Sequence, residues 1–441
     1  MRQVGQMRRT AERALYVWKD KRTRKPLLVY GARQVGKTYL IRAFGTEAFE
    51  QVLYVNFEKE ISLRTLFEQD YDPHRIVTAL GAYFNMSVIP GSTLLVFDEV
   101  QEAPGALTAL KYFMEEMPEL HVMGAGSLLG IAISQKTSFP VGKVEFLRLY
   151  PMSFHEFLLA QGEEAMVKAI VQKEIAILDI LHDKLVLQLK DYLFVGGMPE
   201  VVSTFIQTRV HHEARAVQRD ILMAYEQDFS KHAPASVIPK IRTVWNAIVS
   251  QLAKENKKFI YGLLRGGARA REFESALDWL EDYGLVYRVR SVSKAHVPLA
   301  SYASTSSFKL YIHDCGLLGA MGNLSAKALL EKDNLFTEFK GSMTEQFVLQ
   351  ELKANGIDQL FYWSSDTGSA EVDFLFEKEG IPTPLEVKAS ENLQAKSLRV
   401  FADKYPESRC FKTSLSRYRE EAWVTNVPLY GVGRIHFPNA I

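Results

Sequence analysis

The sequence predicts an α/β protein whose N-terminal part is built around a parallel sheet. Between residues 26 and 150, five short apolar runs alternate with helical patterns. The runs are continuously apolar, which is typical of strands covered by helices on both faces. Parallel strands need long crossover connections, and helices between the runs supply them. The runs cover residues 27–31, 52–58, 93–99, 121–127 and 144–149.

Length and composition indicate how many domains to expect and which kinds of site the chain can form. A chain of 441 residues is longer than one hydrophobic core usually serves, so two or three domains are expected. The net charge is only +1, so binding to nucleic acid would need a local basic patch. Two cysteines, Cys315 and Cys410, are too few for a disulfide framework or a cysteine-built zinc site. We therefore expect a cytoplasmic protein in a reducing compartment.

No targeting or membrane segment is predicted. The first 25 residues are basic but lack the apolar core of a secretory signal, and they resemble an amphipathic helix. The longest mildly apolar stretch, residues 122–133, is interrupted by glycine. A membrane-spanning helix needs about 18 or more apolar residues. We therefore expect no membrane partner.

Beyond the sheet, the pattern predicts three further regions. Residues 150–232 are helical apart from a glycine–proline break at 194–202, and we interpret them as a helical lid. Two helices over 238–255 and 270–284 precede a strand at 285–292, an order typical of a winged helix. The last third of the chain begins with a predicted helix over residues 343–356. Three strands are predicted after it, at residues 360–365, 371–380 and 381–390, and the last two are joined by a turn at Glu379–Gly380. A further helix is predicted to start near Glu391.

These regions define three expected domains. Residues 1–232 form the parallel-sheet domain with its helical lid, 233–305 a winged helix, and 306–441 a C-terminal α/β domain. The expected functions of the first and third domains depend on particular polar residues.

The stretch "GARQVGKT" after the first apolar run fits the phosphate-loop pattern G-x-x-x-x-G-K-[ST] at every fixed position. Gly36 lets the backbone approach phosphate, Lys37 supplies a charge for the β- and γ-phosphates, and the Thr38 hydroxyl can bind Mg²⁺. An ordinary glycine turn is the alternative, but the strand before and the helical pattern after favour a nucleotide site. The residues expected at the nucleotide are Gly31, Ala32, Arg33, Gln34, Val35, Gly36, Lys37, Thr38 and Tyr39.

Two acids end the third apolar run. Asp98 is expected to hold Mg²⁺, and Glu99 to orient and deprotonate the attacking water. Strand-end acids are common turn residues, but together with the phosphate loop they favour catalysis. Ser127 ends the next run, where it could contact the γ-phosphate or simply form a turn. Glu58 ends the second run, and its role stays open.

The motifs "GARQVGKT", "LLVFDEVQ", "GSLLG" and "LYPMSFHEFL" together resemble AAA-type ATPases of bacteria and archaea that carry a C-terminal domain of long-unknown function. The resemblance spans nearly the whole chain. It implies ATP and Mg²⁺ as cofactors and Asp98 followed by Glu99 as the Walker B acids. It also implies sites completed across the subunits of a homo-oligomer. Lys143 stands where many relatives have an arginine finger, which leaves Arg148 and Arg219 as substitutes or as ordinary solvated residues.

A second constellation lies near the C-terminus. Asp373, Glu386 and Lys388 form D-x12-E-x-K, and Glu386 and Lys388 share a face if this segment is a strand. With Glu345 on the preceding helix, they resemble the PD-(D/E)xK nuclease fold. The resemblance implies that Asp373 and Glu386 bind Mg²⁺ while Lys388 positions water, although Val372 replaces the proline of the motif. A surface ion pair between Glu386 and Lys388 is the alternative.

A basic stretch over residues 254–271 holds six lysines and arginines against one glutamate. It is a candidate DNA contact, or a solvated helix face, since acids follow directly. The leading interpretation is an ATP-hydrolysing AAA-type ATPase coupled to a nuclease-like domain acting on nucleic acid, with DNA as candidate partner. The alternative is an ATP-dependent switch whose C-terminal domain is an inactive scaffold. A small-molecule kinase is disfavoured by the length of the chain and by the winged-helix pattern.

Overall fold

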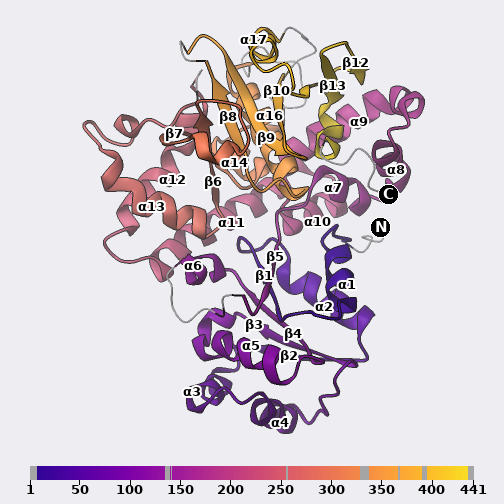
Figure 1. Cartoon of the computed structure of the whole chain (residues 1–441), viewed down its shortest axis with the longest axis vertical. Helices are drawn as coiled ribbons and strands as arrows, with labels where there is room; N and C mark the ends of the chain where they lie inside the picture. The colour runs from indigo at the N-terminus through magenta and orange to yellow at the C-terminus, as the bar shows by residue number, and fades with distance from the viewer. Residues whose placement is uncertain are drawn as a thin grey trace. The chain divides into compact units, whose positions relative to one another are not determined.

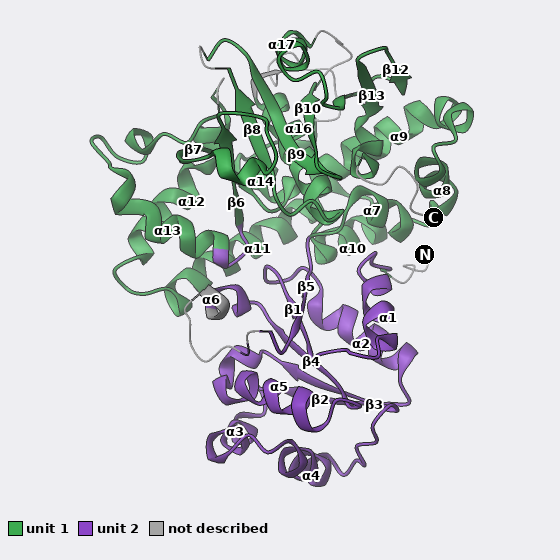
Figure 2. Cartoon of the chain, in the orientation of Figure 1, with its two compact units in different colours: residues 1–7, 151–281, 286–441 green, residues 8–150, 282–285 purple. Residues whose placement is uncertain are grey.

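The computed structural model describes residues 7–134, 140, 142–254, 257–327, 337–365, 368–389 and 395–435. It divides into two compact units, coloured separately in Figure 2. The N-terminal unit comprises residues 8–150 with 282–285, and the C-terminal unit comprises mainly 151–281 and 286–441. Each is described by itself below.

The N-terminal unit is built on a five-stranded parallel sheet in the order β2-β3-β4-β1-β5. All five expected strands are present, so the predicted α/β class with a parallel sheet is confirmed. Strand β4 lies between β1 and β3, which brings the ends of these three strands to one edge. The strands are β1 (Leu27–Tyr30), β2 (Gln51–Asn56), β3 (Thr93–Asp98), β4 (His121–Gly126) and β5 (Glu145–Arg148).

Helices cover this sheet, which explains why its strands are apolar along their whole length (Figure 1). Every residue of β3 is buried. On α2, a Cβ at Gly45 would lie 2.8 Å from Val52 and 3.3 Å from Leu94, so the helix packs closely on the sheet. The elements are α1 (Glu12–Asp20), α2 (Lys37–Ala48), η1 (Ile61–Thr65), α3 (Leu66–Gln69), α4 (Pro73–Phe84), η2 (Val100–Glu102), α5 (Pro104–Glu116) and α6 (Leu129–Ser134).

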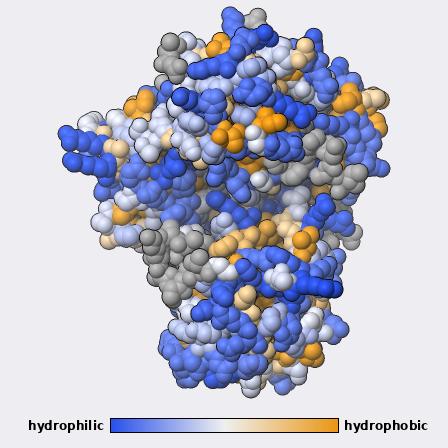
Figure 3. Space-filling view, viewed as in Figure 1, coloured by the Kyte–Doolittle hydropathy of each residue, from blue (hydrophilic) through white to orange (hydrophobic). Residues whose placement is uncertain are grey.

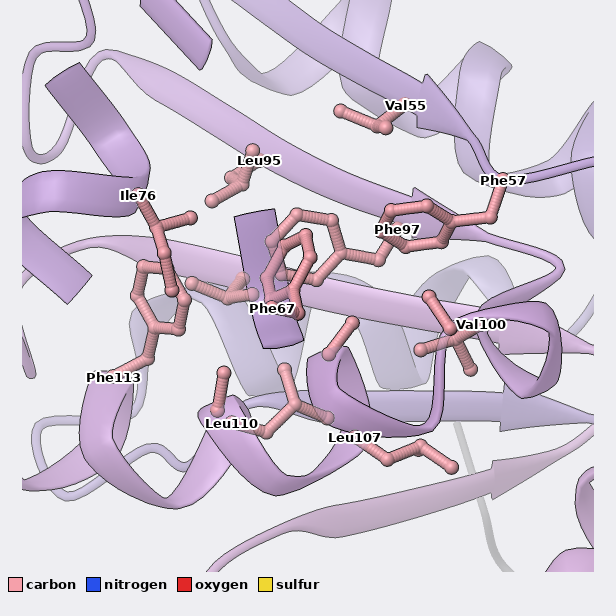
Figure 4. Close-up of a cluster of buried hydrophobic side chains, with 14 of the residues drawn as sticks. Val55, Phe57, Phe67, Ile76, Leu95, Phe97, Val100, Leu107, Leu110 and Phe113 are labelled. Atoms are coloured by element: carbon pink, nitrogen blue, oxygen red, sulfur yellow. The ribbon is translucent and has the colours of Figure 1, made fainter. Parts of the chain in front are cut away.

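A buried cluster of phenylalanines fixes strands β2 and β3 against α3 (Figure 4). The ring centroids of Phe57, Phe67 and Phe97 lie 5.4–5.6 Å from one another. Complete burial of one such side chain contributes roughly 2–3 kcal/mol. The cluster therefore gives a rigid base to the strand end that carries Asp98.

The C-terminal unit contains one eight-stranded mixed sheet in the order β12-β13-β11-β10-β9-β8-β6-β7. Strands β9 and β10 form the expected hairpin, with Glu379 and Gly380 at positive φ of 52° and 75°, as a tight two-residue turn requires. The strands are β6 (Val286–Val292), β7 (Ala303–Ile312), β8 (Phe361–Ser364), β9 (Glu371–Lys378), β10 (Ile381–Val387), β11 (Cys410–Ser414), β12 (Arg419–Glu420) and β13 (Val424–Pro428).

Helices make up the rest of this unit. The segment 150–232 is helical as expected, and the helix expected near Glu391 begins at Lys396, residues 390–394 lying outside the described part. The elements are α7 (Phe154–Ala160), α8 (Glu164–Gln172), α9 (Ile175–Val195), α10 (Pro199–Thr208), α11 (His211–His232), α12 (Ile238–Leu252), η3 (Tyr261–Leu263), α13 (Ala270–Asp282), η4 (Leu299–Tyr302), α14 (Cys315–Met321), α16 (Thr337–Ala354), α17 (Lys396–Lys404) and η6 (Leu429–Arg434).

The structure divides the chain differently from the three expected domains. Strands β6 and β7 follow α12 and α13, as a winged helix would have them, but β6 also pairs in parallel with β8. The expected boundary at 305/306 therefore falls inside β7, and both strands extend the C-terminal sheet. An unpaired edge of a two-stranded ribbon favours such an addition.

Helices α7 to α11 also belong to the C-terminal unit, whereas the expected division joined them to the N-terminal sheet. Buried polar groups tie them to the last third of the chain. Asp314 accepts hydrogen bonds from the Gly197 N–H (2.6 Å) and the Gln350 amide (3.1 Å), and the Gln350 amide also donates to Tyr192 (2.9 Å). A Cβ at Gly197 would lie 2.1 Å from the Met152 oxygen, so the predicted glycine break is a close backbone approach.

The surface agrees with the mixed composition of the chain. On the face drawn in Figure 3, hydrophilic residues dominate and hydrophobic residues form smaller groups among them. In the part of the chain that the structure describes, none of the helices combines the length and the apolar character needed to cross a membrane.

Candidate functional site

The loop after β1 is shaped by residues in the left-handed region. Gly31, Gln34 and Gly36 have φ of 147°, 68° and 94°, and α2 begins directly afterwards. A Cβ at Gly31 would lie 2.1 Å from the Leu149 oxygen, so only glycine fits beside the end of β5. The loop therefore leads into the N-terminus of a 12-residue helix, where free N–H groups favour an anion.

Lys37 is held inside this loop. Its side chain is buried, with 8% exposure, and its Nζ donates to the backbone oxygens of Gly31 and Ala32, each at 2.9 Å. Burial lowers the pKa of Lys37 to about 8, although the charges of Glu99 and Asp98 oppose the shift. Among the described residues no carboxylate forms an ion pair with this ammonium, which leaves its charge available to an anion.

Asp98 lies at the centre of a polar group at the end of β3. Its Oδ2 accepts hydrogen bonds from Thr38 Oγ1 (3.4 Å), Asn56 Nδ2 (3.3 Å) and the Tyr54 hydroxyl. The phosphate-loop threonine and the strand-end acid, 60 residues apart, are thus brought together. Tyr54 and Asn56 were not predicted, although two polar side chains at alternate positions of an otherwise apolar strand are a usable signal.

Glu99 has a constrained backbone. Its φ of 50° and ψ of 46° are left-handed, a conformation that costs a glutamate roughly 1 kcal/mol and is concentrated at functional sites. Burial raises the pKa of Glu99, while a hydrogen bond from Gln101 Nε2 to its Oε2 (2.6 Å) opposes the shift. Gln101 lies inside the quoted motif but was not assigned a role. It fixes the direction of the Glu99 carboxylate.

The C-terminal unit gathers a second set of charges. Glu345 on α16 contacts the Lys257 ammonium directly, lies 4.0 Å from Lys309 Nζ, and accepts a hydrogen bond from Tyr311 (2.9 Å). Lys309 also pairs with Glu371 at 2.7 Å. None of these four partners was predicted. Glu345 is therefore neutralised by two lysines from segments distant in sequence.

The predicted acids of β9 and β10 lie in the same cluster. Asp373 Oδ2 accepts the Val387 N–H (2.8 Å), which joins the two strands, and Lys388 Nζ contacts Glu386 Oε1 at 2.6 Å. Glu386 is buried, and its Oε2 has no hydrogen-bond partner in the structure. The structure therefore brings Asp373, Glu386 and Lys388 together with Glu345.

Burial raises the pKa of each of these acids, and the neighbouring charges add to that effect at Asp373 and outweigh it at Glu345. Burial and the charges of Glu345 and Glu386 raise the pKa of Asp373 well above its usual range, and burial raises the pKa of Glu386. Burial alone would raise the pKa of Glu345, but Lys257 and Lys309 hold it below its usual value. Carboxylate oxygens suit Mg²⁺, and an unpartnered buried oxygen suits a cation. Within the described ranges, however, no group of three or more His, Cys, Asp or Glu residues is arranged to hold a metal ion.

The basic stretch over residues 254–271 does not present one continuous face. The Lys257 side chain is only 13% exposed and contacts Glu345, the backbone of Lys258 forms an isolated β-bridge with Lys309 on β7, and Arg265 pairs with Glu272 at 2.6 Å. The charges of Lys257 and Arg265 are therefore engaged within the C-terminal unit.

The comparisons with known proteins agree with the geometry of the first site. Residues 23–158 match a family model described as an AAA domain. This region is an AAA-type ATPase domain. The α/β fold, the parallel P-loop sheet and the AAA type of ATPase, all expected from the sequence, are thus confirmed. Residues 186–328 and 340–430 match two domains of unknown function, DUF8612 and DUF4143.

Solved structures resemble the chain only distantly, and no curated protein matches it. A Walker-type ATPase of Pyrococcus abyssi has 14% identity, a TM-score of 0.46, and covers 71% of this chain and 94% of its own. The Orc1 protein of Aeropyrum pernix, in complex with DNA, has 13% identity and a TM-score of 0.30, covering 73% and 94%. Cdc6p of Pyrobaculum aerophilum has 12% identity and a TM-score of 0.25, covering 69% and 88%. At these scores the resemblances do not bear on function.

The other candidate residues of the AAA domain lie at the ends of strands β4 and β2 and in the phosphate loop. Ser127 directly follows β4, and its neighbour Gly126 lies against Gln101, whose Oε1 would be 2.1 Å from a Cβ at Gly126. Glu58 follows β2, and its N–H donates to Asn56 Oδ1 (3.0 Å). Arg33, Gln34 and Tyr39 are exposed on the loop and first helical turn, while Ala32 and Val35 are buried beneath them.

The three candidate arginine-finger positions differ in their neighbours and in their distance from the phosphate loop. Lys143 pairs with Glu115 at 2.8 Å. Arg148 on β5 pairs in register with Tyr30 next to the phosphate loop, and its guanidinium lies 5.9 Å from the Tyr30 ring centre. Arg219, in the C-terminal unit, donates to Asn323 Oδ1 at 2.9 Å. Only Arg148 is adjacent to the loop within the AAA domain.

Arg9 is a residue of this site that sequence reasoning missed. Its guanidinium is buried and donates to the backbone oxygens of Val35 (2.8 Å) and Tyr150 (2.6 Å). It therefore holds the phosphate loop to the residues that follow β5. The only sequence signal was a basic residue just before the first helix, which is too common to be specific.

We expect nucleotide binding to take up protons above pH 8. Because Lys37 has a pKa of about 8, it is partly neutral at pH 9, and a bound triphosphate would restore its charge. Calorimetry of MgATP binding at pH 9 in buffers of different ionisation enthalpy should show uptake approaching about one proton, and much less at pH 7. The Lys37→Arg variant, charged at both values, should lose this difference. Equal uptake by both proteins would assign the proton to another group.

Proposed function

We propose that the AAA domain binds and hydrolyses ATP and controls a nuclease-like C-terminal unit that acts on nucleic acid. The observation that supports the ATPase most strongly is the contact between Thr38 and Asp98, 3.4 Å between side-chain oxygens. It places a hydroxyl and a carboxylate, the hard oxygen ligands that Mg²⁺ prefers, beside the phosphate loop.

In this proposal each side chain has a separate task. The N–H groups of the loop and the Lys37 ammonium hold the β- and γ-phosphates. Thr38 and Asp98 would hold Mg²⁺, which neutralises charge on the phosphates when bound. Glu99, raised in pKa by burial and directed by Gln101, accepts the proton of the attacking water. Ser127 is proposed to orient that water or the γ-phosphate from the neighbouring strand.

For the C-terminal unit we propose metal-dependent phosphodiester cleavage. Asp373 and Glu386 would hold Mg²⁺, whose chemistry is to lower the pKa of bound water and stabilise charge on the phosphate. Lys388, 2.6 Å from Glu386, would position the water, and Glu345 would orient the group from α16. The supporting observation is the buried Glu386 Oε2 that lacks a partner.

The alternative, an ATP-dependent switch with an inactive C-terminal scaffold, is supported by a different observation. Lys257 and Lys309 neutralise Glu345, and Lys309 also pairs with Glu371. Acids already compensated by buried lysines need no metal for folding. The two functions therefore differ in whether Mg²⁺ is required near Asp373.

The remaining expectations are part of the same proposal. The succession α12, α13, β6 and β7 supports a winged-helix-like element that could contact DNA, although its strands join the larger sheet. The 254–271 stretch supplies Arg269 and Arg271 to such a surface. Homo-oligomerisation and a cytoplasmic location follow from the resemblance and the composition.

The Asp373→Ala variant is expected to lose Mg²⁺-dependent cleavage of plasmid and single-stranded DNA by at least 100-fold, because one metal ligand is removed. The Lys37→Ala variant should lose ATP hydrolysis and the response of cleavage to ATP, while Mg²⁺-dependent cleavage itself persists. Gel assays with and without EDTA, together with phosphate release, measure both activities.

The matched control is Asp403→Ala, which removes a surface carboxylate paired with Arg399 at 3.0 Å. It should cleave like the wild type. Intact ATP hydrolysis without any cleavage by the wild type would instead favour the switch.

A further inference from the structure

A cavity of about 40 Å³ lies in the C-terminal unit between α8 and α9 on one side and strands β11 and β13 on the other. Its walls are largely apolar, and they include the buried residues Ile170, Leu178 and Phe411 and the partly buried Val427. Phe411 is the register partner of Thr425, so both strands present the same face to it. The space is sufficient for a few water molecules and opens to the surface.

Four cations surround this apolar cavity. Lys173 and Arg409 are exposed at its edge, whereas Lys378 is buried and Arg434 is partly buried. Among the residues that the structure describes, no carboxylate forms an ion pair with any of the four. The arrangement concentrates positive charge beside apolar walls.

Two of these cations have unusual environments. Lys378 Nζ donates to the backbone oxygen of Ile435 at 3.2 Å, and among the described residues the buried Arg434 Nε has no hydrogen-bond partner. Burial lowers the pKa of Lys378, the charges of Arg409 and Lys173 lower it further, and Glu379 opposes them. A buried cation without a counterion costs free energy that a bound anion would offset.

Other buried lysines in the structure show the contrast. Lys309 pairs with Glu371 at 2.7 Å, and Lys412 pairs with Glu421 at 3.2 Å. Lys37 of the phosphate loop, like Lys378, donates to backbone oxygens and has a lowered pKa. The environment of Lys378 therefore differs from that of the lysines held in structural ion pairs and resembles that of Lys37.

We propose that this cavity binds a small organic anion whose carboxylate or phosphate contacts Lys378, Arg409 and Arg434 and whose short apolar group lies against Phe411 and Val427. The ligand class is an amphipathic monoanion or dianion with a short apolar chain, because the cavity is small, has apolar walls and opens to the surface, so that part of the ligand can lie outside it. The site is separate from both the nucleotide loop and the acidic cluster of β9 and β10.

Calorimetric titration of the full chain with hexanoate, hexyl phosphate and neutral hexanamide tests the proposal. At least one of the two anions should bind, at least 10-fold more tightly than hexanamide, and the tighter anion identifies the head group. Lys378→Gln should weaken its binding at least 10-fold. Lys294→Gln, which changes an exposed lysine outside the cavity, should not.

Three other outcomes would contradict the proposed anion site. Equal affinity for hexanamide would make it a plain apolar cavity, and absence of binding by both anions to the wild type would contradict it outright. If Lys378→Gln does not fold, judged by circular dichroism, the exposed Lys173→Gln and Arg409→Gln variants replace it, and an unchanged affinity in both refutes the proposal. The Lys37→Ala variant should bind the anion normally, which separates this site from the proposed ATPase.

Discussion

Replacing Glu99 by glutamine is expected to reduce ATP hydrolysis by 10²- to 10⁴-fold while MgATP still binds. Glutamine keeps the shape of the side chain and its hydrogen bond with Gln101, but it cannot accept a proton from water. Asp98 keeps its contacts with Thr38 and Tyr54, so the proposed metal ligands are intact. Phosphate release at saturating MgATP measures the first effect, and calorimetric titration measures the second.

Glu102→Gln provides the matched control. Glu102 follows three residues later, and its carboxylate lies 3.3 Å from Arg64 in a partly exposed ion pair. Its loss should change neither binding nor turnover, since such pairs contribute less than about 1 kcal/mol. Wild-type turnover by the Glu99 variant would show that another group acts as the base.

Replacing Lys37 by alanine should weaken MgATP binding about 100-fold. The ammonium would make charge-assisted hydrogen bonds to phosphate oxygens, each worth roughly 1.5–3 kcal/mol, and about 2.7 kcal/mol corresponds to that factor. Lys143→Ala, which removes a surface lysine paired with Glu115 at 2.8 Å, is the control and should bind normally. Equal affinity of the Lys37 variant and the wild type would end the phosphate-loop interpretation.

The same substitution should not destabilise the protein at neutral pH. The pKa of Lys37 falls from 10.5 to about 8, so at pH 7 the folded protein bears the cost of a buried ammonium. Between pH 8 and 10.5 the unfolded chain binds more protons at this residue, and wild-type stability rises with pH in that window. Denaturant unfolding of both proteins at pH 7 and 10 should therefore show that the free energy of unfolding of the wild type increases relative to that of the variant. A constant difference would indicate that Lys37 titrates as in the unfolded chain.

The nucleotide site could be predicted from the sequence because its parts follow local rules. The apolar run of Leu94 to Phe97 identifies a strand covered on both faces, and the carboxyl ends of parallel strands share one edge. Asp98 and the phosphate loop therefore had to lie near each other once both motifs were recognised. Tyr54 and Asn56 were missed because β2 was treated only as an apolar run.

The C-terminal cluster could be predicted only in part. The alternation of Glu386 and Lys388 and the hairpin at Glu379 depend on neighbouring residues, and both occur in the structure. Lys257 reaches Glu345 across 88 positions, and no local periodicity encodes such a contact. The pairing of β6 with β8 was missed for the same reason, because a pattern of two helices and a strand does not specify which other strand lies beside β6 in the sheet.

Arg9 makes the phosphate loop and the end of β5 mechanically dependent on each other. One guanidinium group bonds Val35 inside the loop and Tyr150, the last residue of the AAA domain's unit before the chain enters the other unit. The position of the loop backbone at Val35 and that of the backbone at Tyr150 are therefore coupled through one planar guanidinium group within this unit.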